Sequence, residues 1–212
     1  MNVDARPATR RLLLCGAVAG PLFLLVVLLQ DYSRPGVEPR VQPLSLLALG
    51  SWGWLQMFNF VGAGVLNLGY AIGLRRVLPG GGSGTAAPVL IAAYGLGLVA
   101  VGVFRTDPAD GFPPGAGEPA SLSWHGALHN VGGLVVFLSL AGALVAFALQ
   151  LRLRRERGWA LYALGSAVIV LVLFLAAGID GWEARALRLG TLVGWMAASL
   201  IAAKLESHRA AG

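Results

Sequence analysis

Charged side chains are scarce in this sequence, and their scarcity excludes whole classes of protein. Asp, Glu, Lys and Arg make up 12% of its 212 residues, whereas 57% of the residues are hydrophobic and the mean hydropathy is +0.73. A soluble globular domain carries about 25% charged residues. The chain lacks the polar side chains that would cover a water-facing surface. This excludes a disordered protein, an ordinary cytosolic enzyme and a nucleic-acid-binding domain.

Cysteine is scarcer still. The single cysteine, Cys15, excludes an intramolecular disulfide and any metal site built from a cysteine cluster.

No repeat of fixed period and no domain boundary is visible along the chain. We therefore expect a single membrane domain over residues 1–212.

Long apolar runs take the place of the missing charges. A bilayer core of about 30 Å is crossed by about 20 mostly apolar residues in a helix. The sequence predicts an all-α integral membrane protein, a compact bundle of six transmembrane helices, with spans at about 12–29, 52–74, 87–104, 125–149, 159–179 and 189–205. Arginines precede the first span, as in a signal peptide, but no small-residue cleavage motif follows it. We therefore expect an uncleaved first helix.

Basic residues are distributed unequally between the two sides that these spans define. Eleven lie on the side of the termini and five on the other. Cytoplasmic segments carry the excess of Lys and Arg, so we expect both termini to be cytoplasmic and the protein to be a multi-pass protein of the cell (plasma) membrane. The eleven are Arg6, Arg10, Arg11, Arg75, Arg76, Arg152, Arg154, Arg155, Arg157, Lys204 and Arg209.

The connections differ in character. Residues 79–84, with the sequence PGGGSG, read as a flexible linker. Two longer, proline-rich connections lie on the outer side, and unstructured loops of such length are often functional. Residues 44–49 in the first of them are apolar, so we expect them to lie in the membrane interface or to dip back into the protein. The small-residue pairs Gly16/Gly20 and Gly69/Gly73 predict closely packed helices.

Two histidines four residues apart begin the fourth predicted span. Residues at this spacing lie on one helix face, so His125 and His129 can point in the same direction. Asp107 opens the connection that leads to them. Two imidazoles and a carboxylate can form an acid–base unit or hold zinc with one open position. We predict that Asp107, His125 and His129 share an outer-side pocket as candidate catalytic residues, with zinc as the candidate cofactor.

The same histidines have a structural interpretation. Imidazoles near a helix end also donate hydrogen bonds to loop carbonyls and pin the loop. The HxxxH spacing lacks the internal glutamate of the metalloprotease helix, which weakens the metal interpretation. Ionisable groups at membrane depth, by contrast, usually mark function. Both interpretations stay open. If the pair is catalytic, the deeper His129 is the expected base.

Polar residues form a line on the second span. Gln56, Asn59 and Asn67 fall within about 80° of one another on a helix, and with Asp180 they are candidate substrate-binding residues. Amides in membrane helices also hydrogen-bond neighbouring helices, which contributes about 0.6–2 kcal/mol each. We favour this second interpretation for the line on the second span.

Several short motifs together resemble the bacterial domain-of-unknown-function 998 family. They are DYSRPG from Asp31, PLSLLALG from Pro43, GWLQ from Gly53, TDP from Thr106, and SWHG from Ser123 with His129 following. The resemblance covers roughly residues 10–180. It implies a six-span membrane protein and draws attention to Asp107, His125 and His129. It implies no particular activity, because none is established for the family.

Several functions therefore stay open. The first is a membrane enzyme that acts on a lipid or prenyl substrate from the outer leaflet, by hydrolysis or by acid–base catalysed rearrangement. The alternative is a non-enzymatic transporter, or an accessory or structural membrane subunit. Membrane lipids are the expected partners, and no nucleic acid is expected.

Overall fold

The computed structural model describes residues 7–78, 80–117 and 119–210, with the side chains of residues 208–210 outside that description. Among these residues, six helices are long and apolar enough to cross a membrane, and no strand is present. Each overlaps one expected span, so the prediction of an all-α bundle of six membrane helices is confirmed. They are α1 (Pro7–Ser33), α2 (Gly53–Val77), α3 (Gly82–Val103), α4 (Trp124–Leu153), α5 (Arg157–Ala176) and α6 (Glu183–Ala210).

Most of the helices are longer than the apolar runs that predicted them. Thus α6 begins at Glu183, and α4 continues to Leu153. Hydropathy marks only the part of a helix that matches the hydrocarbon, whereas its backbone hydrogen bonds continue into the interface. An acidic side chain such as Glu183 also suits the positive end of the helix dipole in a first turn.

The glycine-rich linker is shorter than expected. The prediction for residues 79–84 is wrong for its second half, because α3 already begins at Gly82. The backbone N–H of Gly81 donates to Thr85 Oγ1 at 2.9 Å, which helps to order this start. Pro79 lies outside the described residues. Because α2 ends at Val77 and α3 begins at Gly82, the connection between them is short.

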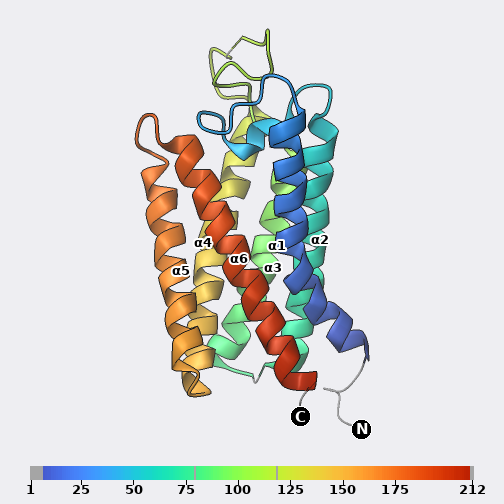
Figure 1. Cartoon of the computed structure of the whole chain (residues 1–212), viewed down its shortest axis with the longest axis vertical. Helices are drawn as coiled ribbons and strands as arrows, with labels where there is room; N and C mark the ends of the chain where they lie inside the picture. The colour runs from blue at the N-terminus through green and yellow to red at the C-terminus, as the bar shows by residue number, and fades with distance from the viewer. Residues whose placement is uncertain (1–6, 79, 118, 211–212) are drawn as a thin grey trace.

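The helices form a ring. Consecutive helices pack side by side, and α6 returns to α1 (Figure 1). Small residues bring the backbones together: a Cβ atom on Gly64 would lie 2.7 Å from the carbonyl oxygen of Gly95, and one on Gly95 would lie 2.8 Å from that of Gly64. On α1, Gly16 similarly leaves room for the ring of Tyr70, and Gly20 for Ser199 of α6.

The two ends of the bundle differ. The first turns of α1 and the last turns of α6 lie at the same end, where Arg10 Nε and Glu206 Oε1 are 2.6 Å apart. The opposite end carries residues 34–52, 104–123 and 177–182, and we call it the loop end. Figure 1 shows α6 crossing the bundle obliquely, from beside α5 at the loop end to beside α1 at the other.

A short 3-10 helix, η2 (Leu44–Ala48), closes part of the loop end. Its leucines Leu46 and Leu47 are buried, so of the two positions predicted for residues 44–49 the structure has the one that dips back into the protein. Arg34 holds this segment in place, since its Nη1 donates to Leu47 O at 2.5 Å and its Nη2 to Leu49 O at 2.6 Å. One guanidinium thereby satisfies two carbonyls that the fold takes away from water.

Candidate functional site

Ser123 caps the start of α4 and ties it to the loop before it. Its Oγ accepts a hydrogen bond from the N–H of Gly126 at 3.0 Å, as an N-cap serine does. Its own N–H and Oγ–H donate to the two carboxylate oxygens of Asp107, at 2.8 and 2.5 Å. Gly126 leaves room for that carboxylate, because a Cβ there would collide with Asp107. Asp107 therefore fixes the beginning of α4.

His125 belongs to the same cap. Its Nδ1 lies 2.9 Å from Ser123 Oγ and 3.1 Å from the carbonyl oxygen of Arg105, and it is 3.8 Å from Asp107 Oδ1. Because the Ser123 hydroxyl proton points to Asp107 and a carbonyl can only accept, Nδ1 is the donor in both contacts. The His125 side chain is 42% exposed. Its contacts pin the loop, as the structural interpretation expects.

The Asp107 carboxylate should make the protein sensitive to acid. Its hydrogen bonds from the side chain and backbone of Ser123 lower the pKa of Asp107 from its usual value. A lowered pKa stabilises the folded state above the unfolded pKa of about 3.9, and this is lost as the pH falls through the folded value. Thermal unfolding in detergent should therefore show the wild type losing stability as the pH falls below the unfolded pKa of about 3.9.

Two variants test whether the Asp107 carboxylate causes this pH dependence. Asp107→Asn should lose less stability on acidification than the wild type, since it has no charge to lose. Asp180→Asn removes an exposed carboxylate instead and should behave like the wild type. The same pH dependence in Asp107→Asn and in the wild type would contradict this account of the cap.

His129 lies one turn deeper and has a different environment. Its side chain is buried, and Nδ1 lies 2.8 Å from the carbonyl oxygen of Phe104 at the end of α3. That carbonyl can only accept, so Nδ1 carries a proton, and in the neutral ring Nε2 holds the lone pair. His129 also lines a large cavity. The structure thus brings Asp107 and His125 together at the cap and His129 to the cavity wall.

The zinc ligand set expected from the sequence does not fit this geometry. Both oxygens of Asp107 accept from Ser123 in the cap of α4, where His125 also lies, whereas His129 lines the cavity. Within the described part of the chain, no three His, Cys, Asp or Glu side chains are grouped so that they could hold a metal ion. A metal therefore enters none of the steps considered below.

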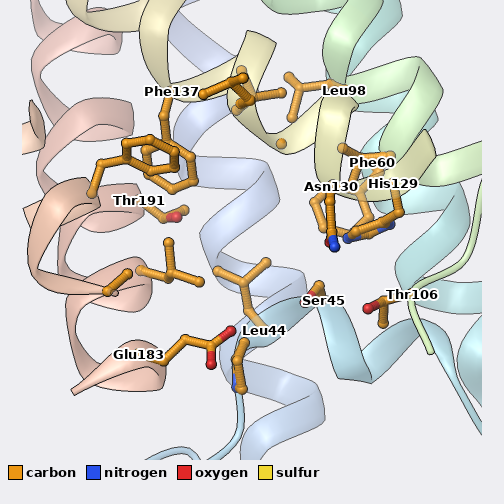
Figure 2. Close-up of a pocket in the computed structure, with 18 of the residues that line it drawn as sticks. Leu44, Ser45, Phe60, Leu98, Thr106, His129, Asn130, Phe137, Glu183 and Thr191 are labelled. Carbon is orange, nitrogen blue, oxygen red and sulfur yellow. The ribbon is translucent and has the colours of Figure 1, made fainter. Parts of the chain in front are cut away.

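The cavity occupies the loop-end half of the ring and measures about 710 Å³. All six helices and η2 contribute to its wall. Its deeper part is apolar and aromatic, with Phe137 and Trp195 among the lining side chains. Figure 2 shows His129 and Asn130 side by side, with Ser45 and Thr106 on the same side of the cavity and Glu183 beside Leu44 on the other.

The polar line on α2 lies outside this cavity. Gln56 Oε1 accepts from Gln30 Nε2 at 2.8 Å, and Asn59 Nδ2 donates to Phe23 O at 3.1 Å, so both join α2 to α1. Asn67 Nδ2 donates within its own helix, to Ala63 O at 2.9 Å. The contacts of Gln56 and Asn59 are those that the helix-joining interpretation expects, whereas the contact of Asn67 joins no second helix. Asp180 is exposed in the turn after α5, and it too lies outside the cavity wall.

Several polar residues of the cavity were not among the sequence candidates. They are Ser45, Thr106, Asp110, Asn130, Glu183 and Thr191. Asn130 was visible as an amide inside an apolar span, next to His129. Glu183, Thr191 and Trp195 share one face of α6 at multiples of four residues, which is a signal that the sequence also carried. Ser45 and Asp110 lie in connections, and sequence spacing says nothing about where a connection folds.

Comparison with known proteins identifies the family of this chain but no activity or substrate. The family model described as "Protein of unknown function (DUF998)" matches residues 17–204. The chain belongs to the DUF998 family. This confirms the resemblance that the sequence motifs carried, and the family match covers all of the residues described above except the first turns of α1 and the end of α6. No curated protein and no solved structure matches this DUF998 chain.

Proposed function

We propose that this DUF998 protein takes one lipid or prenyl molecule from the outer leaflet of the plasma membrane and acts on it, with His129 as the acid–base group. The cavity carries the proposal. Its volume of about 710 Å³ falls within the roughly 300–1,000 Å³ of small-molecule sites. An apolar, aromatic interior with a few polar groups at one end suits a molecule that has an apolar chain and a polar head.

The cavity is within reach of the membrane. Two of its lining side chains also face outwards: Leu134 on α4 is 45% exposed and Leu175 on α5 is 74% exposed. A lipid can therefore approach between α4 and α5 without crossing the loops. Its chain would enter the apolar interior, while the part next to its polar head lies near His129 and Asn130.

His129 supplies the chemistry. With Nδ1–H held by Phe104 O, the neutral ring can accept a proton at Nε2 from water, from a hydroxyl or from the bound molecule. This proton transfer serves either a hydrolysis or a rearrangement. Asp107 and His125 are positioning residues in this scheme, because they fix the first turn of α4 and His129 follows one turn later.

Lipid profiling tests this role. Membranes of cells that express the wild type should differ in at least one lipid species from membranes of cells that lack the protein. His129→Ala should abolish that difference, because general acid–base groups contribute about 10²–10⁴-fold to rate. Asp180→Asn should retain it, since Asp180 is exposed and lies outside the cavity wall. Mass spectrometry of lipid extracts, normalised to folded protein, measures the effect.

The outcomes separate the candidate functions. Retention of the lipid change by His129→Ala would contradict the acid–base role. A wild type that changes no lipid, yet purifies with one bound molecule, would contradict the enzyme and favour a non-enzymatic carrier of lipids.

The orientation in the membrane is part of the proposal, because the cavity opens at the loop end. The excess of basic residues at the other end supports cytoplasmic termini. Gly117 and Gly80 lie at opposite ends, and both have open space around them. In a Cys15→Ser background, Gly117→Cys should react with an impermeant thiol reagent in intact cells and Gly80→Cys should not. The reverse labelling pattern would overturn the orientation.

A further inference from the structure

The charged side chains that the structure describes at the rim of the cavity are both acidic. Asp110 and Glu183 line it, and no lysine or arginine does so among the described residues. The two carboxylates belong to different segments, the 104–123 connection and the first turn of α6, and the cavity brings both into one wall. Within the described part of the chain, neither has an ion-pair partner.

The nearby arginines are committed elsewhere. Arg34 donates to Leu47 O and Leu49 O. Arg188 Nη1 pairs with Asp31 Oδ2 at 2.7 Å, and its Nε donates to Gln42 O at 2.9 Å. Among the described residues, neither Arg34 nor Arg188 forms an ion pair with Asp110 or Glu183, and neither lines the cavity.

The turn that carries Asp110 is anchored. Gln42 Nε2 donates to the carbonyl oxygen of Asp110 at 3.3 Å, and the guanidinium of Arg34 lies 5.3 Å from the centre of the Phe112 ring. Asp110 adopts a left-handed backbone conformation with φ of 50°, which aspartate tolerates better than most residues do. The backbone around Asp110 is thus held at the rim by contacts from the 34–52 connection.

We propose that the cavity selects amphiphiles whose polar head carries an ammonium group and excludes those with an anionic head. The inference rests on the lipid-binding function proposed above and names the class of molecule that this function serves. An ammonium group at the rim gains two carboxylate partners, whereas a phosphate group meets two like charges and no cation. His129 and Asn130, deeper in the wall, contact the part of the molecule between head and chain.

Three probes of equal chain length test the selectivity: a long-chain alkylamine, the matching alcohol and the matching alkyl phosphate. Each competes with a fluorescent neutral alkyl probe for the purified full-length protein in an uncharged detergent. The wild type should bind the amine more tightly than the alcohol, and the alcohol more tightly than the phosphate. The amine should exceed the phosphate by about tenfold or more at low salt, and added salt should narrow the ratio.

Variants connect the selectivity to the rim. The double variant Asp110→Asn with Glu183→Gln should bring the amine-to-phosphate ratio close to one while it keeps binding of the alcohol. Asp180→Asn, which removes an exposed carboxylate outside the cavity wall, should keep the wild-type ratio. Glu183→Lys should favour the phosphate.

Each outcome decides one point. A wild type that binds the alcohol but prefers the phosphate, or shows no preference, overturns the ammonium selectivity and leaves the lipid-binding function standing. A wild type that binds none of the three probes overturns the proposed function itself. A preference that survives the double variant shows that the rim carboxylates do not cause it.

Discussion

Gly133→Leu is expected to weaken lipid binding by at least about tenfold while the protein stays folded. Gly133 lines the cavity, and a Cβ placed there meets nothing within 4 Å, so a side chain at this position begins in open space. Leucine and a lipid chain cannot occupy the same volume. Losing contact with two methylene groups costs about 1.6 kcal/mol, which lowers affinity by at least about tenfold.

Gly165 provides the matched control. It lies on the exposed side of α5, where a Cβ also meets nothing within 4 Å, and it is not part of the cavity wall. Gly165→Leu should therefore bind the fluorescent alkyl probe as the wild type does. Equal binding by the wild type, Gly133→Leu and Gly165→Leu, with equal melting temperatures, would show that the probe binds outside the cavity.

Arg34→Ala is expected to cause the largest loss of stability. Its guanidinium serves Leu47 O and Leu49 O, and both residues are buried. A buried acceptor left unpaired costs about 1–3 kcal/mol, so the free energy of unfolding should fall by about 3 kcal/mol or more. The loss of the contact with Phe112 frees a second segment of the loop end.

The control for charge is Arg40→Ala, which removes an exposed arginine from the same connection. Thermal unfolding in detergent should place Arg40→Ala near the wild type and Arg34→Ala well below it. Limited proteolysis should also cut within residues 34–52 faster in Arg34→Ala. Equal melting temperatures for Arg34→Ala and Arg40→Ala would contradict the anchoring role.

The spans were predictable because the bilayer imposes their length. Each helix must present about 20 mostly apolar residues, and runs of this length and composition can be identified directly in the sequence. Helix ends were less predictable: Glu183 and Gly82 belong to helices although a hydropathy window excludes them. Capping and backbone hydrogen bonds decide such positions, and those depend on local geometry that composition does not report.

The candidate site was predictable only in part. The spacing of His125 and His129 placed both on one helix face, and the path of the chain brought Asp107 close to the first of them. Asp107 and His125 belong to the cap of α4, whereas His129 belongs to the cavity wall. This difference depends on where the 104–123 connection folds. The wall around His129 combines side chains from six helices and η2. No local sequence pattern predicts that these residues lie together.

Photo-crosslinking tests the central claim, that the cavity holds a lipid chain, most directly. A neutral lipid with a photoreactive group in the middle of its chain is incorporated with the protein into vesicles, and the adducts are mapped by mass spectrometry. The account predicts adducts concentrated at the deep cavity residues Phe137, Leu140 and Trp195, of which Trp195 is only 2% exposed, and their loss in Gly133→Leu. Adducts confined to outward-facing side chains such as Val65 and Leu161 would contradict it.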